Sequence, residues 1–187
     1  MTTMTNNASE PALPEAITLC GNGIDLREWD DADIPAMVEL FDEDEVGRWT
    51  PLRSPFDEIE ARNYLDRSRA LRAAGVAIQL AITTETRTPL GEILLFRTGS
   101  DAELAYAVGA AYRARGLAAS AVRLLTDYAY RELSIRRVLL RINPANAASV
   151  AVARATGFEL TDDPVTVRGR SGPLRTWCHK AAQRGDS

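Results

Sequence analysis

The chain of 187 residues is poor in the side chains that most often bind metals or act with a serine nucleophile. It contains two cysteines, Cys20 and Cys178, which lie far apart in the sequence, and one histidine, His179. A structural zinc site needs four clustered ligands, mostly Cys and His, and a Ser-His-Asp triad needs a histidine beside its nucleophile. These counts argue against both kinds of site, and we expect no metal.

Long apolar runs and a large excess of one charge are also missing. No segment is long enough to cross a bilayer, and the first residues lack the basic stretch followed by an apolar run that marks an export signal. The formal net charge is −4, which provides no broad basic surface for nucleic acid or for a membrane. We therefore expect a cytoplasmic protein, monomeric or homodimeric, that binds neither.

The length favours one domain with a sizeable core. Residues 1–16 are polar and contain Pro11 and Pro14, which predicts a flexible leader before a folded domain over residues 17–182. Hydrophobic periodicity and turn residues predict the remaining elements. They are a strand at 24–27, a helix at 30–41, a loop at 45–55, a helix at 56–73 with Ile59, Leu65 and Leu71 buried, a hairpin of 76–82 with 90–97, and final strands at 165–167 and 174–179.

Residues 102–158 are the most informative part of the chain. A strand at 103–108 leads into a turn rich in small residues, from which an amphipathic helix begins directly. Backbone N–H groups at such a helix start can face an anion, and Arg113 and Arg115 add positive charge, so the turn suits a pyrophosphate. No Lys-Ser/Thr pair follows Gly116, which argues against a P-loop nucleotide enzyme.

Three motifs in this region resemble those of one superfamily. Arg113-x-x-Gly116-x-Ala118 resembles the Arg/Gln-x-x-Gly-x-Gly/Ala signature of the GNAT N-acetyltransferases. Asn143-Pro-x-Asn146-x-x-Ser149, which ends in Gly157-Phe158, resembles the second motif of the same superfamily. Glu103-Leu-Ala-Tyr106 resembles the strand before the phosphate turn in the branch that includes the ribosomal-protein N-terminal acetyltransferases.

The resemblance runs from about residue 24 to residue 179 and implies a fold and an activity. The fold is a single α/β (α+β) domain with a mixed, mostly antiparallel sheet flanked by helices. Strands 103–108 and 138–142, the fourth and fifth of the predicted strands, run parallel and splay apart. The activity is direct transfer of acetyl from acetyl-CoA to a primary amine, either a peptide or protein N-terminus or a small molecule. The implied cofactor-binding residues are Tyr106, Ala107, Val108, Arg113, Ala114, Arg115, Gly116, Leu117, Ala118, Asn143 and Asn146.

Two side chains are candidates for the chemistry. On an alternating strand Glu103 shares a face with Ala105 and Ala107, which leave space for a substrate, so Glu103 is the candidate general base. Ser149, early in the second helix, is the candidate donor to the leaving thiolate, a role that the resemblance implies. An exposed strand glutamate and an ordinary first-turn serine are the structural alternatives.

The chain departs from the family pattern at one position. Many members carry a tyrosine as general acid four residues before the final Gly-Phe, where this sequence has Ala153. An alternative function is therefore a non-catalytic acyl-CoA-binding protein of the same fold. Trp49 lies in the loop that borders the acceptor pocket in the family, and we expect it either to contact the acceptor or to anchor that loop.

Overall fold

A mixed β-sheet forms the centre of the computed structural model, which describes residues 12–167 and 172–181. Its strands are β1 (Thr18–Gly21), β2 (Ile24–Arg27), β3 (Ala77–Thr83), β4 (Gly91–Thr98), β5 (Asp101–Val108), β6 (Arg137–Ile142), β7 (Glu159–Leu160), β8 (Thr166–Val167) and β9 (Pro173–Lys180). The order across the sheet is β1-β2-β3-β4-β5-β6-β9-β7, and β8 pairs with β9. Only β5 and β6 are parallel among the strand pairs of the described residues. The predicted fold class is confirmed.

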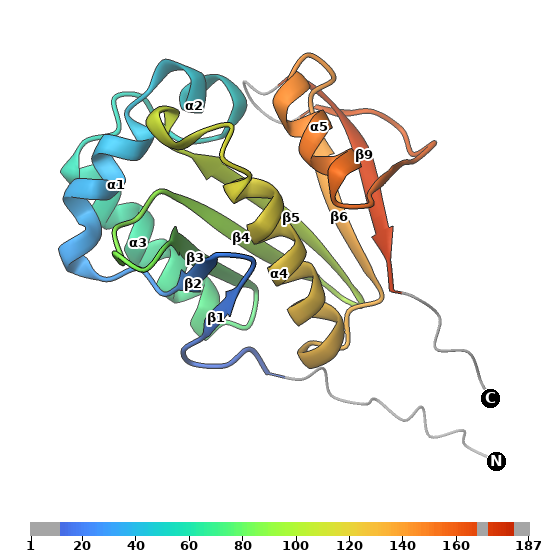
Figure 1. The fold of residues 1–187 in the computed structure, drawn as a ribbon, viewed down its shortest axis with the longest axis horizontal. Coiled ribbons are helices and arrows are strands. Elements are labelled where there is room, and N and C mark those ends of the chain that lie inside the picture. The colour runs from blue at the N-terminus through green and yellow to red at the C-terminus, as the bar shows by residue number, and fades with distance from the viewer. Residues whose placement is uncertain (1–11, 168–171, 182–187) are drawn as a thin grey trace.

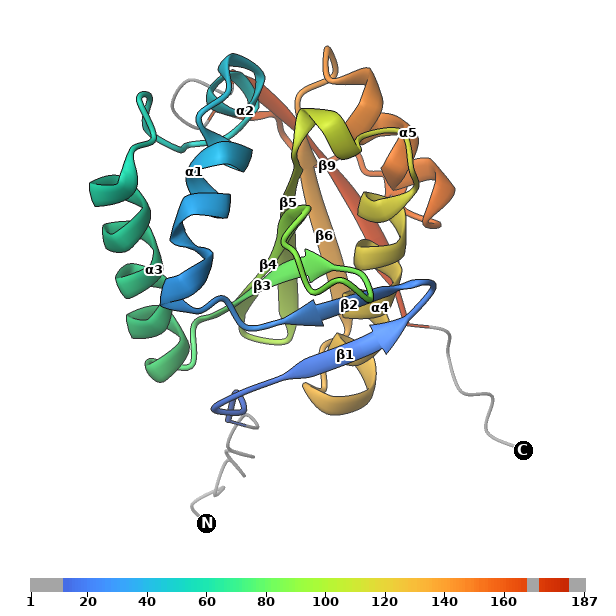
Figure 2. The same cartoon turned by 60° about the vertical axis from the view of Figure 1, so that its left-hand side comes forward.

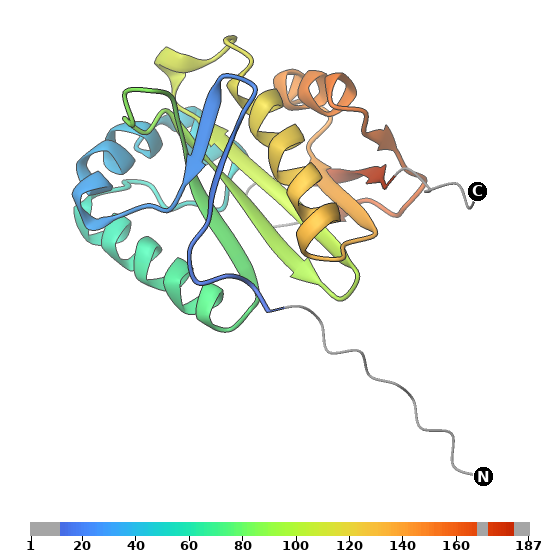
Figure 3. The same cartoon turned by 60° about the horizontal axis from the view of Figure 1, so that its bottom comes forward.

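Helices cover both faces of the sheet, as Figures 2 and 3 show. α1 (Ile34–Phe41) and α3 (Glu58–Ala73) lie on one face, and α4 (Leu117–Glu132) lies on the other with α5 (Ala147–Ala155) beside it. Three short helical segments complete the fold, η1 (Asp31–Asp33), α2 (Asp44–Trp49) and η2 (Ala110–Tyr112). The helix that follows β5 returns the chain to a parallel neighbour, as a crossover connection does.

Strand β3 shows how the sheet forms two cores. Ile78, Leu80 and Ile82 are fully buried in the core beneath α4. The alternate residues face α1 and α3, where Ala81 belongs to the second core and Gln79 is a buried polar side chain. Strand residues alternate between faces, so this polar position lies on the α3 side of the sheet.

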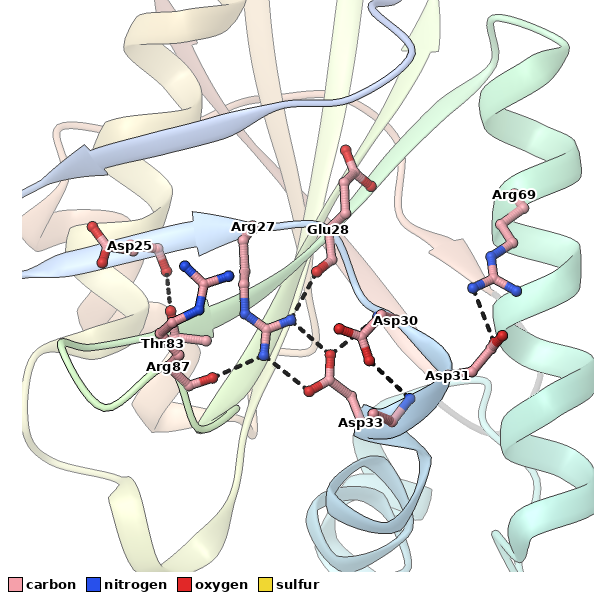
Figure 4. A network of polar contacts seen from close by, with 10 residues as sticks. Asp25, Arg27, Glu28, Asp30, Asp31, Asp33, Arg69, Thr83 and Arg87 are labelled. Atoms are coloured by element: carbon pink, nitrogen blue, oxygen red, sulfur yellow. Dashed lines mark hydrogen bonds and ion pairs between the residues drawn. The ribbon is translucent and has the colours of Figure 1, made fainter.

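Figure 4 shows a buried ion pair at the start of the first helical segment. Arg27 donates from Nη1 to Asp33 Oδ2 at 2.6 Å and from Nη2 to Asp33 Oδ1 at 2.9 Å. The same guanidinium donates to the backbone carbonyls of Glu28 and Arg87. Burial opposes ionisation of Asp33, but the hydrogen bonds from Arg27 and from the Asp30 backbone N–H outweigh it and lower the pKa of that carboxyl. The pair therefore ties β2 to η1 and to the turn between β3 and β4.

Two details of the predicted elements are wrong. The expected loop at 45–55 begins with the six-residue helix α2, which is held by the buried side chain of Val46 and by a bond of 2.7 Å from Thr50 Oγ1 to the Val46 carbonyl. Ile59 is 71% exposed, because α3 turns Ala61 and Leu65 toward the core instead.

Some of the predicted segments lie outside the described residues, and others are confirmed. The leader prediction falls largely on residues 1–11, which lie outside the described residues, as does most of the turn between the last two predicted strands. The hairpin of β3 and β4 is confirmed. β1 was not predicted, so each predicted strand is one place later in the structure. The parallel pair expected between the fourth and fifth predicted strands therefore corresponds to β5 and β6.

Candidate active site

The parallel strands β5 and β6 separate part-way along their length, as predicted. Their Cα pairing runs from Asp101 with Arg137 to Leu104 with Leu140 and ends there. Residues 105–108 of β5 remain paired to β4 alone within the described chain. Figure 1 shows the two strands diverging toward α2 and α5. The separation leaves one edge of β5 available for a ligand.

Two cavities meet at this separation. The first, here called the turn cavity, has a volume of about 440 Å³ and lies between β5, the turn at 109–116 and the start of α4. The second, here called the sheet cavity, has a volume of about 360 Å³ and lies on the α3 side of β3, β4 and β5. The residues that line both are Trp49, Thr50, Tyr106, Ala107, Asn146 and Ser149. We call these six residues the shared border, because ligands in the two cavities would meet there.

The turn cavity is lined by backbone at a helix start. Gly116 has a φ of +77° and caps α4 without a side-chain hydrogen bond, and a Cβ built on it meets no atom within 4 Å. Gly116, Leu117 and Ala118 all line the cavity. The first N–H groups of an α-helix have no partner within the helix, so this end can bind an anion. All the predicted cofactor-binding residues except Arg115 and Asn143 line the turn cavity.

Arg113 is held by carboxylates on the segment that carries α2. Its Nη2 donates to Glu43 Oε2 at 2.9 Å, its Nη1 donates to Glu45, and its Nε donates to the Val108 carbonyl at 3.0 Å. Its predicted contact with a pyrophosphate stays a prediction. The structure shows that Arg113 links the turn to the segment that carries α2, although the two are about 70 residues apart in the chain. Arg115 is exposed, with its guanidinium 5.6 Å from the centre of the Tyr112 ring.

The start of α5 brings Ser149 to the shared border. The Asn146 side chain caps this helix by accepting from the Ser149 backbone N–H at 3.1 Å. The Asn143 side chain accepts from the Ala145 N–H at 2.9 Å, which shapes the turn before the helix, and Asn143 lines the sheet cavity. The Ser149 hydroxyl takes no part in the cap and lies near the Tyr106 hydroxyl at the shared border.

Tyr106 adds a second hydroxyl at the shared border. Burial raises the pKa of this phenol, and the nearby Ser149 hydroxyl offsets part of the shift. The sequence predicted Tyr106 as a cofactor-binding residue, and its position between the two cavities brings its hydroxyl near the predicted donor.

Glu103, the predicted base, lines the sheet cavity. Its side chain is 18% exposed, and its Oε2 accepts a hydrogen bond of 2.9 Å from Arg141 Nε. The sequence prediction missed Arg141, which faces Glu103 from the neighbouring strand β6. The charge of Glu103 is therefore balanced by a guanidinium, and its role as a base stays a prediction.

Glu92 is a second carboxyl in the sheet cavity, and the sequence prediction missed it. It lies in the middle of β4 and is 3% exposed. Tyr64 donates its hydroxyl to Oε1 at 2.9 Å, and Gln79 donates from Nε2 to Oε2 at 2.6 Å. Burial raises the pKa of Glu92 to about 7, although both hydrogen bonds oppose the shift. A lone carboxylate within the apolar run at 90–96 was the signal that could have revealed it.

Trp49, the predicted acceptor residue, ends α2 and lines both cavities. The guanidinium of Arg48 lies 4.6 Å from the centre of its ring, a cation–π arrangement. His179 lies outside both cavity linings, and its Nδ1 is 2.8 Å from the Tyr130 hydroxyl. Trp49 therefore borders both cavities, and its contact with the acceptor stays a prediction.

The described residues contain neither a metal-binding cluster nor a membrane-spanning helix. Within residues 12–167 and 172–181 no group of three or more His, Cys, Asp and Glu side chains could hold a metal ion. No helix in that part of the chain is long and apolar enough to cross a membrane.

Comparisons with known proteins identify a family and a fold. A family profile described as an acetyltransferase (GNAT) domain matches residues 24–159. A protein of Bacillus licheniformis named uncharacterized N-acetyltransferase p20 is 24% identical over 147 residues, covering 76% of this chain and 82% of that protein. RimJ of Mycobacterium smegmatis, solved in complex with CoA-disulfide, superposes with a TM-score of 0.79 at 18% identity over 96% of this chain and 93% of RimJ. RimL, a ribosomal L7/L12 alpha-N-protein acetyltransferase solved with coenzyme A, gives a TM-score of 0.76 at 17% identity over 88% of this chain and 98% of RimL.

Proposed function

The chain belongs to the GNAT acetyltransferase family, and from this membership we propose that it transfers acetyl from acetyl-CoA directly to a primary amine. One structural observation supports the proposal independently of family membership. A cavity with a helix start suited to phosphates and a cavity with two carboxyls meet at the shared border. Two reactants held there would be positioned for direct transfer without a covalent enzyme intermediate.

Acetyl-CoA is the proposed occupant of the turn cavity. Its pyrophosphate would bind the backbone N–H groups of residues 115–118, where the space in front of Gly116 is free of protein atoms. The structures of RimJ and RimL with bound CoA support this assignment. A thioester at the shared border would lie beside Ser149, whose hydroxyl is the proposed hydrogen-bond donor to the leaving sulfur.

The sheet cavity is the proposed acceptor site. Its apolar lining suits a compact apolar group, while Glu92 and Glu103 favour a cationic or hydrogen-bond-donating amine. That combination fits the N-terminal residue of a peptide or a small amine. The name of RimL supports a peptide N-terminus as one candidate, and use of acetyl-CoA fits the expected cytoplasmic location. The apolar side chains concerned are Leu52, Leu71, Leu94, Phe96 and Leu174.

The reaction couples the two sites through one nitrogen. The neutral amine attacks the thioester carbonyl carbon, and the carbon–sulfur bond then breaks with its electron pair leaving on sulfur. An ammonium ion cannot attack, because its nitrogen has no free lone pair. A carboxyl of the sheet cavity would therefore accept one of its protons. Ser149 would stabilise the thiolate until it is protonated.

Release of free thiol tests the proposal. The chain should convert acetyl-CoA to CoA in the presence of at least one member of a panel of peptides and small amines, with the acetylated product identified by mass. A second candidate, a non-catalytic acyl-CoA-binding protein, is favoured by Ala153, which is fully buried at the position of the family tyrosine. Tight CoA binding without thiol release over the whole panel would support that second candidate and refute the transferase.

A further inference from the structure

We propose that Glu92, and not Glu103, accepts the proton of the acceptor amine. The inference rests on the proposed acetyl transfer and assigns a residue that the family motifs do not include. It follows from where the carboxyl lies, from which groups surround it and from how its charge is balanced.

The position of Glu92 gives it access to the shared border. In the register of the sheet, Glu92 lies directly opposite Ala107 on β5 and opposite Ala81 on β3. Glu92 lines the sheet cavity, and the small residue Ala107 beside it is a shared-border residue. Directly opposed residues have Cβ atoms about 4.5–5.5 Å apart, so the carboxyl lies within reach of an amine at the border, directly or through one water.

The two carboxyls of the cavity differ in their partners. Glu103 is paired with the guanidinium of Arg141. The hydrogen bonds to Glu92 come from neutral groups, the Tyr64 hydroxyl and the Gln79 amide. Each oxygen of a carboxylate can accept more than one hydrogen bond, so Glu92 retains acceptor capacity for the acceptor amine. An ammonium ion entering the cavity would supply the cation that Glu92 lacks among its hydrogen-bond donors.

The protonation of Glu92 suits this role. Burial raises its pKa to about 7, so a substantial fraction is carboxylate at neutral pH and can take a proton. The other titratable or charged side chains that line the same cavity are Tyr64 and Arg67 of α3, Glu103 and Tyr106 of β5 and Arg141 of β6. Tyr64 titrates well above neutral pH, because burial raises its pKa and the nearby charge of Glu92 raises it further.

The proposed step conserves atoms and charge. One N–H bond of the ammonium breaks, and its proton forms an O–H bond on Glu92. The freed lone pair attacks the thioester carbonyl carbon, and the carbon–sulfur electron pair leaves on sulfur. A second nitrogen proton ends on the thiolate, and Glu92 later releases its own proton to solvent. The products are the N-acetyl amine, CoA thiol and one proton.

The Glu92→Gln variant tests the assignment, because it keeps the shape of the side chain and removes its basicity. At pH 7.5 its kcat should be about 100-fold or more below that of the wild type, with the Kd for CoA within twofold by calorimetry. The wild-type profile of kcat/KM against pH should rise through a limb near pH 7, because burial raises the pKa of Glu92 to about 7. That limb should stay in place when acceptors of different amine pKa are used, and it should disappear in the variant.

Two matched variants separate a proton acceptor from a structural residue. Tyr64→Phe removes a donor that stabilises the Glu92 carboxylate, so the limb should move to higher pH. Glu103→Gln should leave the limb in place. If Glu92→Gln keeps the limb, or if Glu103→Gln abolishes it, the assignment is wrong although acetyl transfer stands. A wild-type protein that acetylates no amine would refute the proposed function and this inference together.

Discussion

Replacing Gly116 tests the proposed pyrophosphate site, because the structure separates the effect of a new side chain on the fold from its effect on the ligand. A Cβ at this position meets no protein atom within 4 Å, so a longer side chain would project into the space proposed for the phosphates. The backbone has a φ of +77°, where residues with a Cβ are strained by about 1–2 kcal/mol. Gly116→Gln and Gly116→Glu share this strain and nearly the same bulk.

The expected magnitudes follow from those two terms. The strain should lower the melting temperature of both variants alike, by about 2–4 °C per kcal/mol for a domain of this size. Crowding of the phosphates should weaken CoA binding by about tenfold or more, which is about 1.4 kcal/mol. The glutamate adds a like charge, and two unit charges about 6 Å apart at an effective dielectric constant of about 20 repel by about 3 kcal/mol. Screening reduces this repulsion, so we expect Glu to bind about tenfold more weakly than Gln at low salt.

Isothermal titration calorimetry with CoA at low and high salt measures both effects. The gap between the Gln and Glu variants should narrow as salt rises, while the gap between wild type and Gln should change little. Circular dichroism melts identify variants that remain folded. A folded Gly116→Glu protein that binds CoA as tightly as the wild type would show that the phosphates bind elsewhere.

Four further outcomes are expected. Arg27→Ala should lower the free energy of unfolding in urea by about 3–5 kcal/mol, because Asp33 would remain as a buried charge without its partner. The pKa of Asp33 is lower in the folded state than in the unfolded state. Its contribution to stability is therefore complete above its unfolded pKa of about 3.9 and is lost as pH falls through the folded pKa. The difference in stability between wild type and Asp33→Asn should shrink in acid. Ser149→Ala should lower kcat without moving the limb near pH 7 or melting α5, because only the backbone N–H of Ser149 takes part in the cap. Trp49→Ala should raise KM for the acceptor in steady-state assays, and an unchanged KM would remove this residue from the acceptor site.

The parts of the fold that were predicted depend on local patterns. The hairpin, the parallel pair and the separation of β5 from β6 follow from alternating strands, a turn of small residues and a helix that joins two strands. The elements that were missed depend on distant contacts. β1 has four residues with no fully buried side chain, and α2 has only six residues, too few to be stable without the burial of Val46. The exposure of Ile59 follows from the orientation of α3, which its own weak apolar stripe does not determine.

The candidate site was predicted less completely than the fold. The motifs indicated Gly116, Asn146 and Ser149, because their positions are fixed by the local backbone of a turn or a helix start. They could not reveal that Arg113 is engaged by the acidic residues before and within α2, since that contact joins segments about 70 residues apart. The same contact connects the proposed phosphate turn to the segment that ends in Trp49.

The two carboxyls of the sheet cavity show why residue type and strand position do not identify a base. Glu103 and Glu92 both lie on cavity-facing strand positions, and the sequence favoured Glu103 because it shares a strand face with the small residues Ala105 and Ala107. Their surroundings differ, since Glu103 is balanced by Arg141 while Glu92 is buried with two neutral donors. Burial raises the pKa of Glu92 to about 7, and a carboxyl that titrates near neutral pH is well suited to accept the proton of an ammonium ion. The assignment of roles is therefore a property of the packing between β4, β5, β6 and α3, which becomes visible only when those elements are assembled.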